Sequence, residues 1–344
     1  MRKNSMQQQL IDTARALVAP GKGILAADES TGTITKRLDS IGVESTEANR
    51  QAYRDLLFTT EGAEAFVSGV ILFEETLFQS GLDGTPFTDL LAGKGVIPGI
   101  KVDKGAKPLA GSPDEKITEG LDGLRERLAD YAKAGARFAK WRAVITIGGG
   151  IPTDYCIDTN AHALARYAAL CQEAGIVPIV EPEVLMDGPH DIGRCEAVTE
   201  RTLARVFDEL VAQHVLLEGM LLKPNMVISG TECPQQAGVD EVAATTLRCL
   251  RRHVPAAVPG IVFLSGGQSD ELATRHLNAM NQLGDAPWTL SFSYGRALQA
   301  PALAAWSGKS DNVPAAQQAY YRRARCNGAA ARGQYTDAME QDAA

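Results

Sequence analysis

Basic residues are in the minority in this sequence, which limits the partners it can have. The chain has 34 Lys and Arg residues against 42 Asp and Glu residues, a formal net charge of −8. Nucleic-acid binding depends on clustered positive charge that neutralises backbone phosphates. We therefore expect no nucleic-acid partner, and a phosphorylated small molecule would have to be bound by a local basic site.

Long apolar stretches are also missing. No segment approaches the roughly 20 apolar residues that a helix needs to cross a bilayer. The first ten residues contain no apolar core of the kind found in signal peptides. These absences favour a protein of the cytoplasm with no membrane partner.

Metal-ligand patterns and disulfide patterns are absent too. The six cysteines are scattered without a Cys-x-x-Cys pair, which is typical of reduced thiols rather than of disulfides or structural zinc. The five histidines form no His-x-x-His or His-Glu-x-x-His pair, the spacing on which many metal-dependent enzymes rely. The sequence therefore predicts no metal site.

What the sequence does contain is a regular alternation of short apolar runs and longer segments of helical period. Most of the apolar runs are continuous, as in parallel strands that are buried on both faces. The predicted strands are Gly23–Asp28, Val67–Phe73, Val96–Asp103, Ala136–Arg142, Ile176–Glu181, Leu217–Lys223, Gly260–Ser265 and Trp288–Ser293. The predicted helices between them include Thr46–Phe58, Thr118–Ala134, Thr159–Ala174, Asp191–His214, Val239–His253 and Asp270–Leu283, with caps at Thr118, Thr159 and Ser269.

Polar residues end successive apolar runs at a nearly constant interval. Lys101, Lys140, Glu181, Lys223 and Ser265 are separated by 39, 41, 42 and 42 residues, about the length of one strand, one helix and two loops. Eight such units nearly fill the chain, which predicts an α/β fold made of a single (β/α)8 TIM barrel over residues 1–344. A last helix after Val313 and a loosely ordered polar tail from about Gln334 complete it.

An open doubly wound sheet is the alternative fold. It explains the alternation equally well but not why polar residues end so many strands. In a barrel those strand ends converge on one opening, the mouth, where active sites lie.

The predicted mouth is rich in charge. Lysine and glutamate are seldom buried unless they are paired, and ion pairs that merely close the barrel are the structural alternative. The functional hypothesis is a Schiff-base enzyme, because a lysine attacks a carbonyl only as the neutral amine, which a nearby cation and desolvation both favour. Either Lys140 or Lys223 could be the nucleophile, and neighbouring carboxylates could carry protons. The charged residues at these strand ends are Asp28, Lys101, Asp103, Lys140, Arg142, Glu181, Glu183 and Lys223.

Two loops late in the chain predict an anion site. Ser265-Gly266-Gly267 follows the seventh predicted strand, and Tyr294-Gly295-Arg296 follows the eighth. Glycine loops before helices expose backbone N–H groups, and an arginine adds charge. Phosphate binding is the favoured interpretation, with an ordinary tight turn as the alternative.

Seven blocks of the sequence closely resemble the class I fructose-bisphosphate aldolase family, from about Gln9 to about Tyr335. The blocks are Gly21–Ser30, Gly99–Gly105, Phe138–Arg142, Val180–Glu183, Leu221–Met226, Phe263–Gln268 and Phe292–Gln299.

The resemblance implies roles for individual residues. Lys223 looks like the Schiff-base nucleophile, Glu181 like the main proton carrier with Glu183 in support, and Asp28 and Lys140 like the pair acting at the C4 hydroxyl. The implied C1-phosphate site consists of Ser265, Gly266, Gly295 and Arg296. The implied C6-phosphate region consists of Ser30, Thr33, Lys36, Arg37, Lys101 and Arg142, with Thr33 where many relatives have serine.

The same resemblance implies reversible, metal-independent and cofactor-free cleavage of fructose 1,6-bisphosphate in glycolysis and gluconeogenesis by a homotetramer. A Schiff-base aldolase that prefers fructose 1-phosphate remains the alternative enzyme. A catalytically inactive scaffold is disfavoured because Lys223, Glu181, Asp28 and Lys140 are all present. Animal members carry a C-terminal tyrosine that assists proton exchange on the enamine. No tyrosine follows Tyr335 here, so whether Tyr335 or another group does this is left open.

Overall fold

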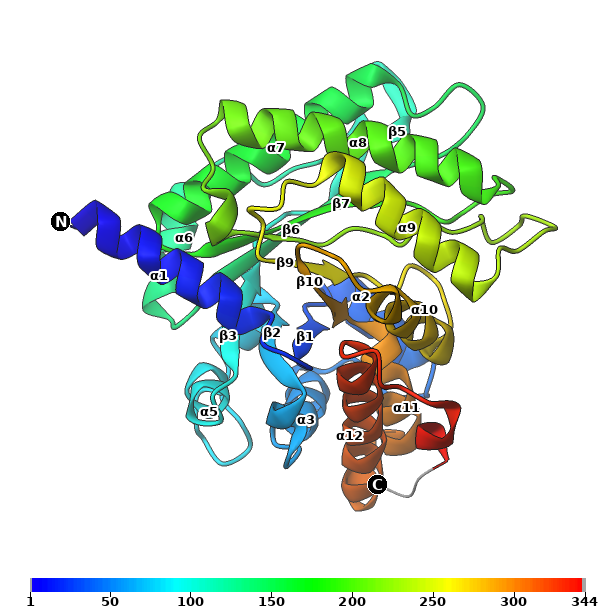
Figure 1. Ribbon diagram of the computed structural model, residues 1–344. Helices are drawn as coiled ribbons and strands as arrows, with labels where there is room; N and C mark the ends of the chain where they lie inside the picture. The colour runs from blue at the N-terminus through cyan, green and yellow to red at the C-terminus, as the bar shows by residue number, and fades with distance from the viewer. Residues whose placement is uncertain (1, 342–344) are drawn as a thin grey trace.

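Eight parallel strands close into a barrel in the order β1-β10-β9-β8-β7-β6-β3-β2 in the computed structural model, which describes residues 2–341, with side chains from residue 5 onward (Figure 1). The strands are β1 (Gly23–Ala27), β2 (Val67–Leu72), β3 (Ile97–Lys101), β6 (Phe138–Ile145), β7 (Val177–Val184), β8 (Leu221–Leu222), β9 (Gly260–Phe263) and β10 (Thr289–Tyr294). Each overlaps one predicted strand. The (β/α)8 prediction is confirmed. The open-sheet alternative is wrong because each of the eight strands pairs with two neighbours, so the sheet has no edge strand.

Helices surround the strands, with α7 packed on α8, α8 on α9, and α11 on α12 (Figure 1). They are α1 (Arg2–Leu17), α2 (Thr31–Asp39), α3 (Glu47–Phe58), α4 (Glu74–Leu77), α5 (Phe87–Gly93), α6 (Leu124–Lys133), α7 (Asp154–Glu173), α8 (Ile192–Ala212), α9 (Val239–His253), α10 (Asp270–Leu283), α11 (Arg296–Trp306) and α12 (Val313–Ala330). Of the helices described, none combines the length and the apolar character that spanning a membrane requires.

Side-chain caps decide where several of these helices begin. Ser269 Oγ accepts a hydrogen bond from the Leu272 N–H at the start of α10, as predicted. The other two predicted caps are wrong. Thr153, not Thr159, caps α7 by accepting from the Cys156 N–H, and Thr118 ends a strand rather than starting a helix.

The segment before α6 forms an antiparallel hairpin that the sequence did not predict. It consists of β4 (Ala106–Leu109) and β5 (Ser112–Thr118). Because β5 occupies the start of the predicted helix Thr118–Ala134, α6 begins only at Leu124. The predicted strand Leu217–Lys223 is also shorter than expected, since Leu217–Gly219 forms a 3-10 helix.

Successive side chains along each strand point to opposite faces of the sheet and form two separate packed layers. One cluster lies between strands and helices, and a second, including Ile71, Phe138 and Val262, fills the barrel interior. The end of α1 belongs to the interior cluster through Leu17 and Val18. Glycine makes room for this filling, since a Cβ on Gly99 would lie 2.3 Å from the Phe138 ring and one on Gly260 would lie 2.5 Å from Val18.

The described part of the predicted tail is anchored at two residues. Tyr335 is buried, its N–H donates to Asn278 Oδ1 at 2.9 Å, and its hydroxyl donates to Glu340 Oε1 at 2.9 Å. Glu340 also pairs with the buried Arg323. Loose order of the tail stays a prediction, and residues 342–344 lie outside the described part.

Candidate active site

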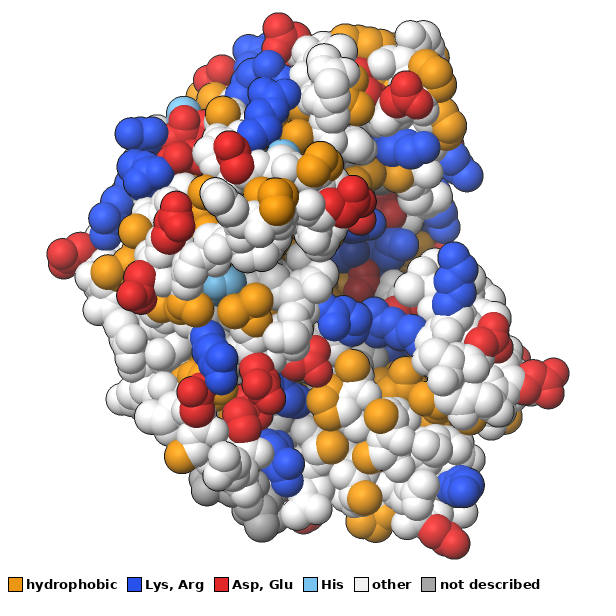
Figure 2. Space-filling view, turned by 90° about the vertical axis from the view of Figure 1, so that its right-hand side faces the viewer, with side chains coloured by type: hydrophobic (Ala, Val, Ile, Leu, Met, Phe, Trp, Pro, Cys, Tyr) orange, Lys and Arg blue, Asp and Glu red, His pale blue; other side chains and the backbone are white. Residues whose placement is uncertain are grey.

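A cavity of about 410 Å³ opens at the carboxyl end of the barrel. Figure 2 shows Lys and Arg side chains gathered with acidic ones in a hollow of this face. The cavity is lined by the ends of β1, β3, β6, β7 and β10 and by the segments that follow β1, β3, β7, β8, β9 and β10. It therefore lies where the sequence placed the mouth.

Strand alternation aims the central side chains into this cavity. Lys140 lies two positions after the interior residue Phe138 on β6, and Glu181 lies two positions after the interior residue Ile179 on β7. The register of the parallel strands then places charged residues of neighbouring strands side by side. Lys101 on β3 is paired with Lys140 on β6, and Arg142 on β6 is paired with Glu181 on β7. Charged groups from neighbouring strands are thus brought to one level.

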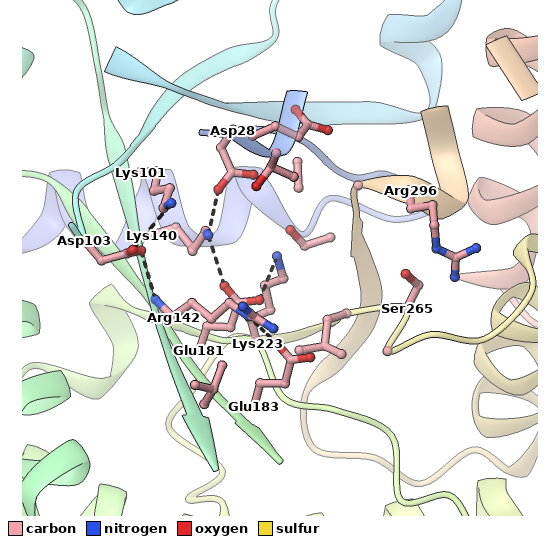
Figure 3. A pocket seen from close by; sticks show the side chains of 18 of the residues that line it. Asp28, Lys101, Asp103, Lys140, Arg142, Glu181, Glu183, Lys223, Ser265 and Arg296 are labelled. Atoms are coloured by element: carbon pink, nitrogen blue, oxygen red, sulfur yellow. Dashed lines mark hydrogen bonds and ion pairs between the residues drawn. The ribbon is translucent and has the colours of Figure 1, made fainter. Parts of the chain in front are cut away.

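The Glu181 carboxylate lies between two lysines at the centre of the cavity (Figure 3). Its Oε1 is 3.2 Å from Lys223 Nζ, and its Oε2 is 3.4 Å from Lys140 Nζ. All three side chains are buried. One carboxylate can therefore exchange a proton with either amine without moving far.

Lys140 has a second and closer partner. Its Nζ lies 2.7 Å from Asp28 Oδ2. Burial opposes the charged form of Lys140, but Asp28 and Glu181 outweigh it and raise the pKa of Lys140 above its usual value. Lys140 is therefore held as an ammonium ion.

The pKa values of Asp28 and Glu181 shift in the opposite direction to that of Lys140. Burial alone would raise the pKa of Asp28, but Lys140 and Lys223 outweigh it and lower the pKa well below its usual range. Burial likewise opposes ionisation of Glu181, yet Lys223, Lys140 and Arg142 together lower its pKa. Both groups are carboxylates at neutral pH.

A second set of pairs surrounds this centre. Arg142 Nε donates to Glu183 Oε2, and although burial opposes its charge, Glu183 and other carboxylates raise the pKa of Arg142 further. Asp103 Oδ1 lies 3.5 Å from Lys101 Nζ, and its Oδ2 accepts from the Arg142 N–H at 3.3 Å. Asp103 thereby ties β3 to β6 at the edge of the cavity.

The predicted anion site lies on the other side of Lys223 from Lys101 and Asp103 (Figure 3). Gly266 and Gly267 adopt φ values of +53° and +73°, a conformation that favours glycine. Among the described residues, neither of their N–H groups has a hydrogen-bond partner. With Arg296 at the start of α11 also lining the cavity, the loop can accept an anionic group.

Most predicted site residues come together in this one cavity. Of the implied C6-phosphate region, Lys36 is the exception, since it is exposed on α2 and does not line the cavity. Arg37 does line it, is paired with Glu29, and would lie 3.7 Å from a Cβ on Gly295. The predicted residues that line the cavity are Asp28, Ser30, Thr33, Arg37, Lys101, Lys140, Arg142, Glu181, Glu183, Lys223, Ser265, Gly266, Gly295 and Arg296.

Sequence reasoning missed two features of the site. Ser293 Oγ is buried, lines the cavity, and has no partner among the described residues. Its only signal was its place at the polar end of the last strand. Glu29 is buried between Arg37 and Arg54 and accepts from Gln299 Nε2 at 2.9 Å, contacts across 270 residues that local patterns do not reveal.

Tyr335 does not line the cavity. Within the part of the chain whose side chains are described, no group of three or more His, Cys, Asp or Glu residues is arranged to hold a metal ion.

Known proteins match this chain over nearly its whole length. The family model described as glycolytic "Fructose-bisphosphate aldolase class-I" matches residues 9–344. A "Probable fructose-bisphosphate aldolase class 1" of Xanthomonas campestris pv. campestris is 61% identical over 329 residues, covering 95% of this chain and 98% of the relative. "Fructose-bisphosphate aldolase 6, cytosolic" of Arabidopsis thaliana is 60% identical over 328 residues, covering 95% and 91%.

A solved structure is similarly close. Fructose-bisphosphate aldolase from Plasmodium falciparum, solved in complex with TRAP and a small-molecule inhibitor, superposes with a TM-score of 0.95 at 54% identity and covers 96% of both chains. The barrel and these matches define the chain as a lyase built on the (β/α)8 fold. It belongs to the class I fructose-bisphosphate aldolase family.

Proposed function

We propose that this chain cleaves fructose 1,6-bisphosphate reversibly into dihydroxyacetone phosphate and glyceraldehyde 3-phosphate through a Schiff base on Lys223. The observation that carries the proposal is the position of Glu181 between Lys223 and Lys140, with Asp28 on the far side of Lys140. Both lysines share Glu181, but only Lys140 also pairs with Asp28, so the two lysines are placed for different tasks.

Lys223 is the better candidate for the nucleophile. Lys140 is held as an ammonium ion by Asp28 at 2.7 Å and has no free electron pair to donate. Lys223 has only the more distant Glu181 oxygen, at 3.2 Å. Its amine adds to the C2 carbonyl, and Glu181 carries the protons that leave and return as water is lost and the imine forms.

Cleavage of the C3–C4 bond then uses the imine as the electron sink. The C4 hydroxyl gives its proton to the Asp28 carboxylate, which Lys140 holds in place, the C3–C4 electrons flow into the protonated imine, and glyceraldehyde 3-phosphate leaves. The enamine that remains is protonated at C3, and hydrolysis frees dihydroxyacetone phosphate and Lys223. Glu183 supports Arg142 at the rim through their ion pair.

Cationic groups on both sides of Lys223 support a substrate with two phosphates. Arg296 and the Ser265-Gly266-Gly267 loop would bind the C1 phosphate, with Gly295 allowing close approach. Lys101, Ser30 and Thr33 would receive the C6 phosphate, together with Arg37 and Arg142. Because Lys36 is exposed and does not line the cavity, we omit it from the direct contacts.

We further propose that the chain acts as one barrel domain in the cytoplasm, without cofactor, membrane or nucleic-acid partner, as a homotetramer. Cytosolic isozymes among the relatives and six free cysteines support the location. Sedimentation would test the assembly, and a stable monomer would contradict it.

Borohydride trapping tests the mechanism. The protein is incubated with dihydroxyacetone phosphate and excess chelator, reduced, and mapped by peptide mass. We expect one adduct, on Lys223, with cleavage intact in chelator, and no adduct in Lys223→Met. An adduct on Lys140 would reassign the nucleophile. Absence of any adduct together with chelator-sensitive cleavage would overturn the proposal.

A comparison of substrates tests the second phosphate. We expect kcat/KM for fructose 1,6-bisphosphate to exceed that for fructose 1-phosphate by at least tenfold, and Lys101→Met to reduce this ratio. Equal values for the two sugars in the unmodified protein would contradict a dedicated C6-phosphate region.

A further inference from the structure

Gln268 joins the anion-binding loop to the helix behind it. It follows Ser265-Gly266-Gly267 and precedes α10, and it is buried. Its side-chain Nε2 donates to the Ser265 carbonyl at 2.8 Å, while its own N–H donates to the same carbonyl at 3.2 Å. Two hydrogen bonds from one residue therefore close the loop around its two left-handed glycines.

The main chain of Gln268 also holds the arginine of the site. The Gln268 carbonyl accepts a hydrogen bond from Arg296 Nη2. Arg296 Nη1 lies 3.7 Å from Asp270 Oδ1, so both contacts of this guanidinium are on the segment that leads into α10. The loop and Arg296 thus depend on the same residue for their relative position.

The side chain of Gln268 is itself oriented by a buried histidine. Its Oε1 makes a hydrogen bond with Nδ1 of His276 on α10. A carbonyl can only accept, so the bond to the Ser265 carbonyl fixes which end of the Gln268 amide is Nε2. Oε1 must then face His276, and His276 must donate from Nδ1.

This contact requires a proton on Nδ1 of His276. Only 2% of His276 is exposed, and burial lowers its pKa to about 4. Its Nε2 is buried without a hydrogen-bond partner in the described residues, which fits a nitrogen that carries no proton. A histidine kept in this costly state contributes one thing here, the donor for Gln268.

We propose that Gln268 and His276 are positioning residues that hold the Ser265–Gly267 loop and Arg296 ready to bind the C1 phosphate. The inference rests on the proposed function, since it deepens the assignment of that phosphate site. Neither residue is among those that line the cavity. They lower the cost of ordering the loop when the phosphate binds.

A positioning role predicts a loss of affinity with little loss of the chemical step. The phosphate anchors the substrate, whereas Lys223 and Glu181 lie on other elements and keep their contacts. We expect KM for fructose 1,6-bisphosphate to rise about tenfold when the hydrogen bonds of the Gln268 side chain are removed. This is the scale of one to two hydrogen bonds. The kcat value should stay within about threefold.

Replacement of His276 offers a matched pair of variants. The amide nitrogen of asparagine lies close to where Nδ1 of histidine lies, so His276→Asn keeps the donor to Gln268. The longer glutamine places its nitrogen near Nε2, so His276→Gln loses it. Gln268→Met removes the side-chain hydrogen bonds at similar length. Met280→Ala, a buried substitution on the same helix, controls for general loss of stability.

The measurements are KM and kcat for the bisphosphate, inhibition by inorganic phosphate, and borohydride trapping at increasing dihydroxyacetone phosphate. We expect weaker phosphate inhibition and half-maximal trapping at higher concentration for His276→Gln and Gln268→Met, while His276→Asn and Met280→Ala stay near wild type. Unchanged KM in Gln268→Met would overturn the inference. So would an equal defect in His276→Asn and His276→Gln, or a fall in kcat as large as the rise in KM.

The wild-type protein separates this inference from the function on which it rests. If wild type gives no Lys223 adduct, the proposed function fails. If wild type is trapped on Lys223 and the Gln268 and His276 variants match it in KM, only the positioning role fails. Should His276→Gln not fold, Gln268→Met still decides.

Discussion

The ammonium group of Lys140 lies 2.7 Å from the Asp28 carboxylate, in a cavity that buries most of both side chains. Each charge lowers the cost of burying the other, and each keeps the other ionised. The pair therefore presents a fixed carboxylate and a fixed cation on one side of Lys223, where bond cleavage is proposed.

Loss of the Lys140 charge should separate imine formation from bond cleavage. In Lys140→Met we expect the cleavage rate to fall by about 10²- to 10⁴-fold, the usual contribution of a positioned acid–base group. The borohydride adduct on Lys223 should still form. Steady-state cleavage and peptide mapping of the same sample check this, and unimpaired cleavage or an adduct-free Lys223 would contradict the assigned roles.

The buried imidazole of His276 should make stability fall in mild acid. Its folded-state pKa is about 4 and its unfolded value is about 6.5. Its contribution is therefore complete above pH 6.5 and is lost as pH falls from 6.5 toward 4, because the unfolded state binds the proton first. The total is on the order of 3 kcal/mol.

Urea unfolding of wild type and His276→Asn at several values between pH 7 and pH 4 measures this contribution. The difference in free energy of unfolding between the two proteins should shift against wild type as the pH falls. A difference that stays constant would mean that His276 does not titrate in this window.

The Arg54–Glu29 pair should matter far more than a surface ion pair. Arg54 and Glu29 are both buried, and Arg54 Nη2 lies 2.5 Å from Glu29 Oε2. Breaking a buried pair costs about 3–5 kcal/mol. We therefore expect Arg54→Met to lower the free energy of unfolding by about this amount. Arg125→Met, which breaks the exposed pair with Glu173, is the control and should leave stability near wild type. Similar effects of the two substitutions would contradict the buried role.

Gly99 should be intolerant of a methyl group. A Cβ there would lie 2.3 Å from the Phe138 ring inside the barrel, and overpacking of this kind costs about 1–3 kcal/mol. Gly93→Ala is the matched control, because nothing lies within 4 Å of a Cβ at the end of α5. Thermal unfolding should show a lower Tm for Gly99→Ala and an equal or higher Tm for Gly93→Ala. The reverse order would show that Phe138 moves aside freely.

The barrel itself could be predicted because buried parallel strands are continuously apolar. A search for apolar runs cannot find the hairpin β4–β5. Its residues are largely polar, with Lys107 and Asp114 exposed, so no apolar run marks it. Thr118 then resembled a helix cap because only the helical pattern beyond it was visible.

The catalytic centre was more accessible to sequence reasoning than its supports. Lys140, Glu181 and Lys223 end strands at a regular spacing, and strand ends converge in a barrel. The partners of Glu29 lie 8 to 270 residues away along the chain. Those of Gln268 lie 3 to 42 residues away. Such contacts depend on which helices pack against which strands, information that local patterns do not hold.

Leu17 and Val18 pack with the interior cluster near Gly69 and Gly260, at the amino ends of the strands. Within the described part of the chain, the interior of the barrel below Lys140 is therefore filled, and the cavity around Lys223 opens at the mouth. In the proposed mechanism the two three-carbon products would then leave through this opening in turn, the aldehyde before the covalently held ketone. The rate of turnover would then depend on how quickly each phosphorylated product is released through this opening.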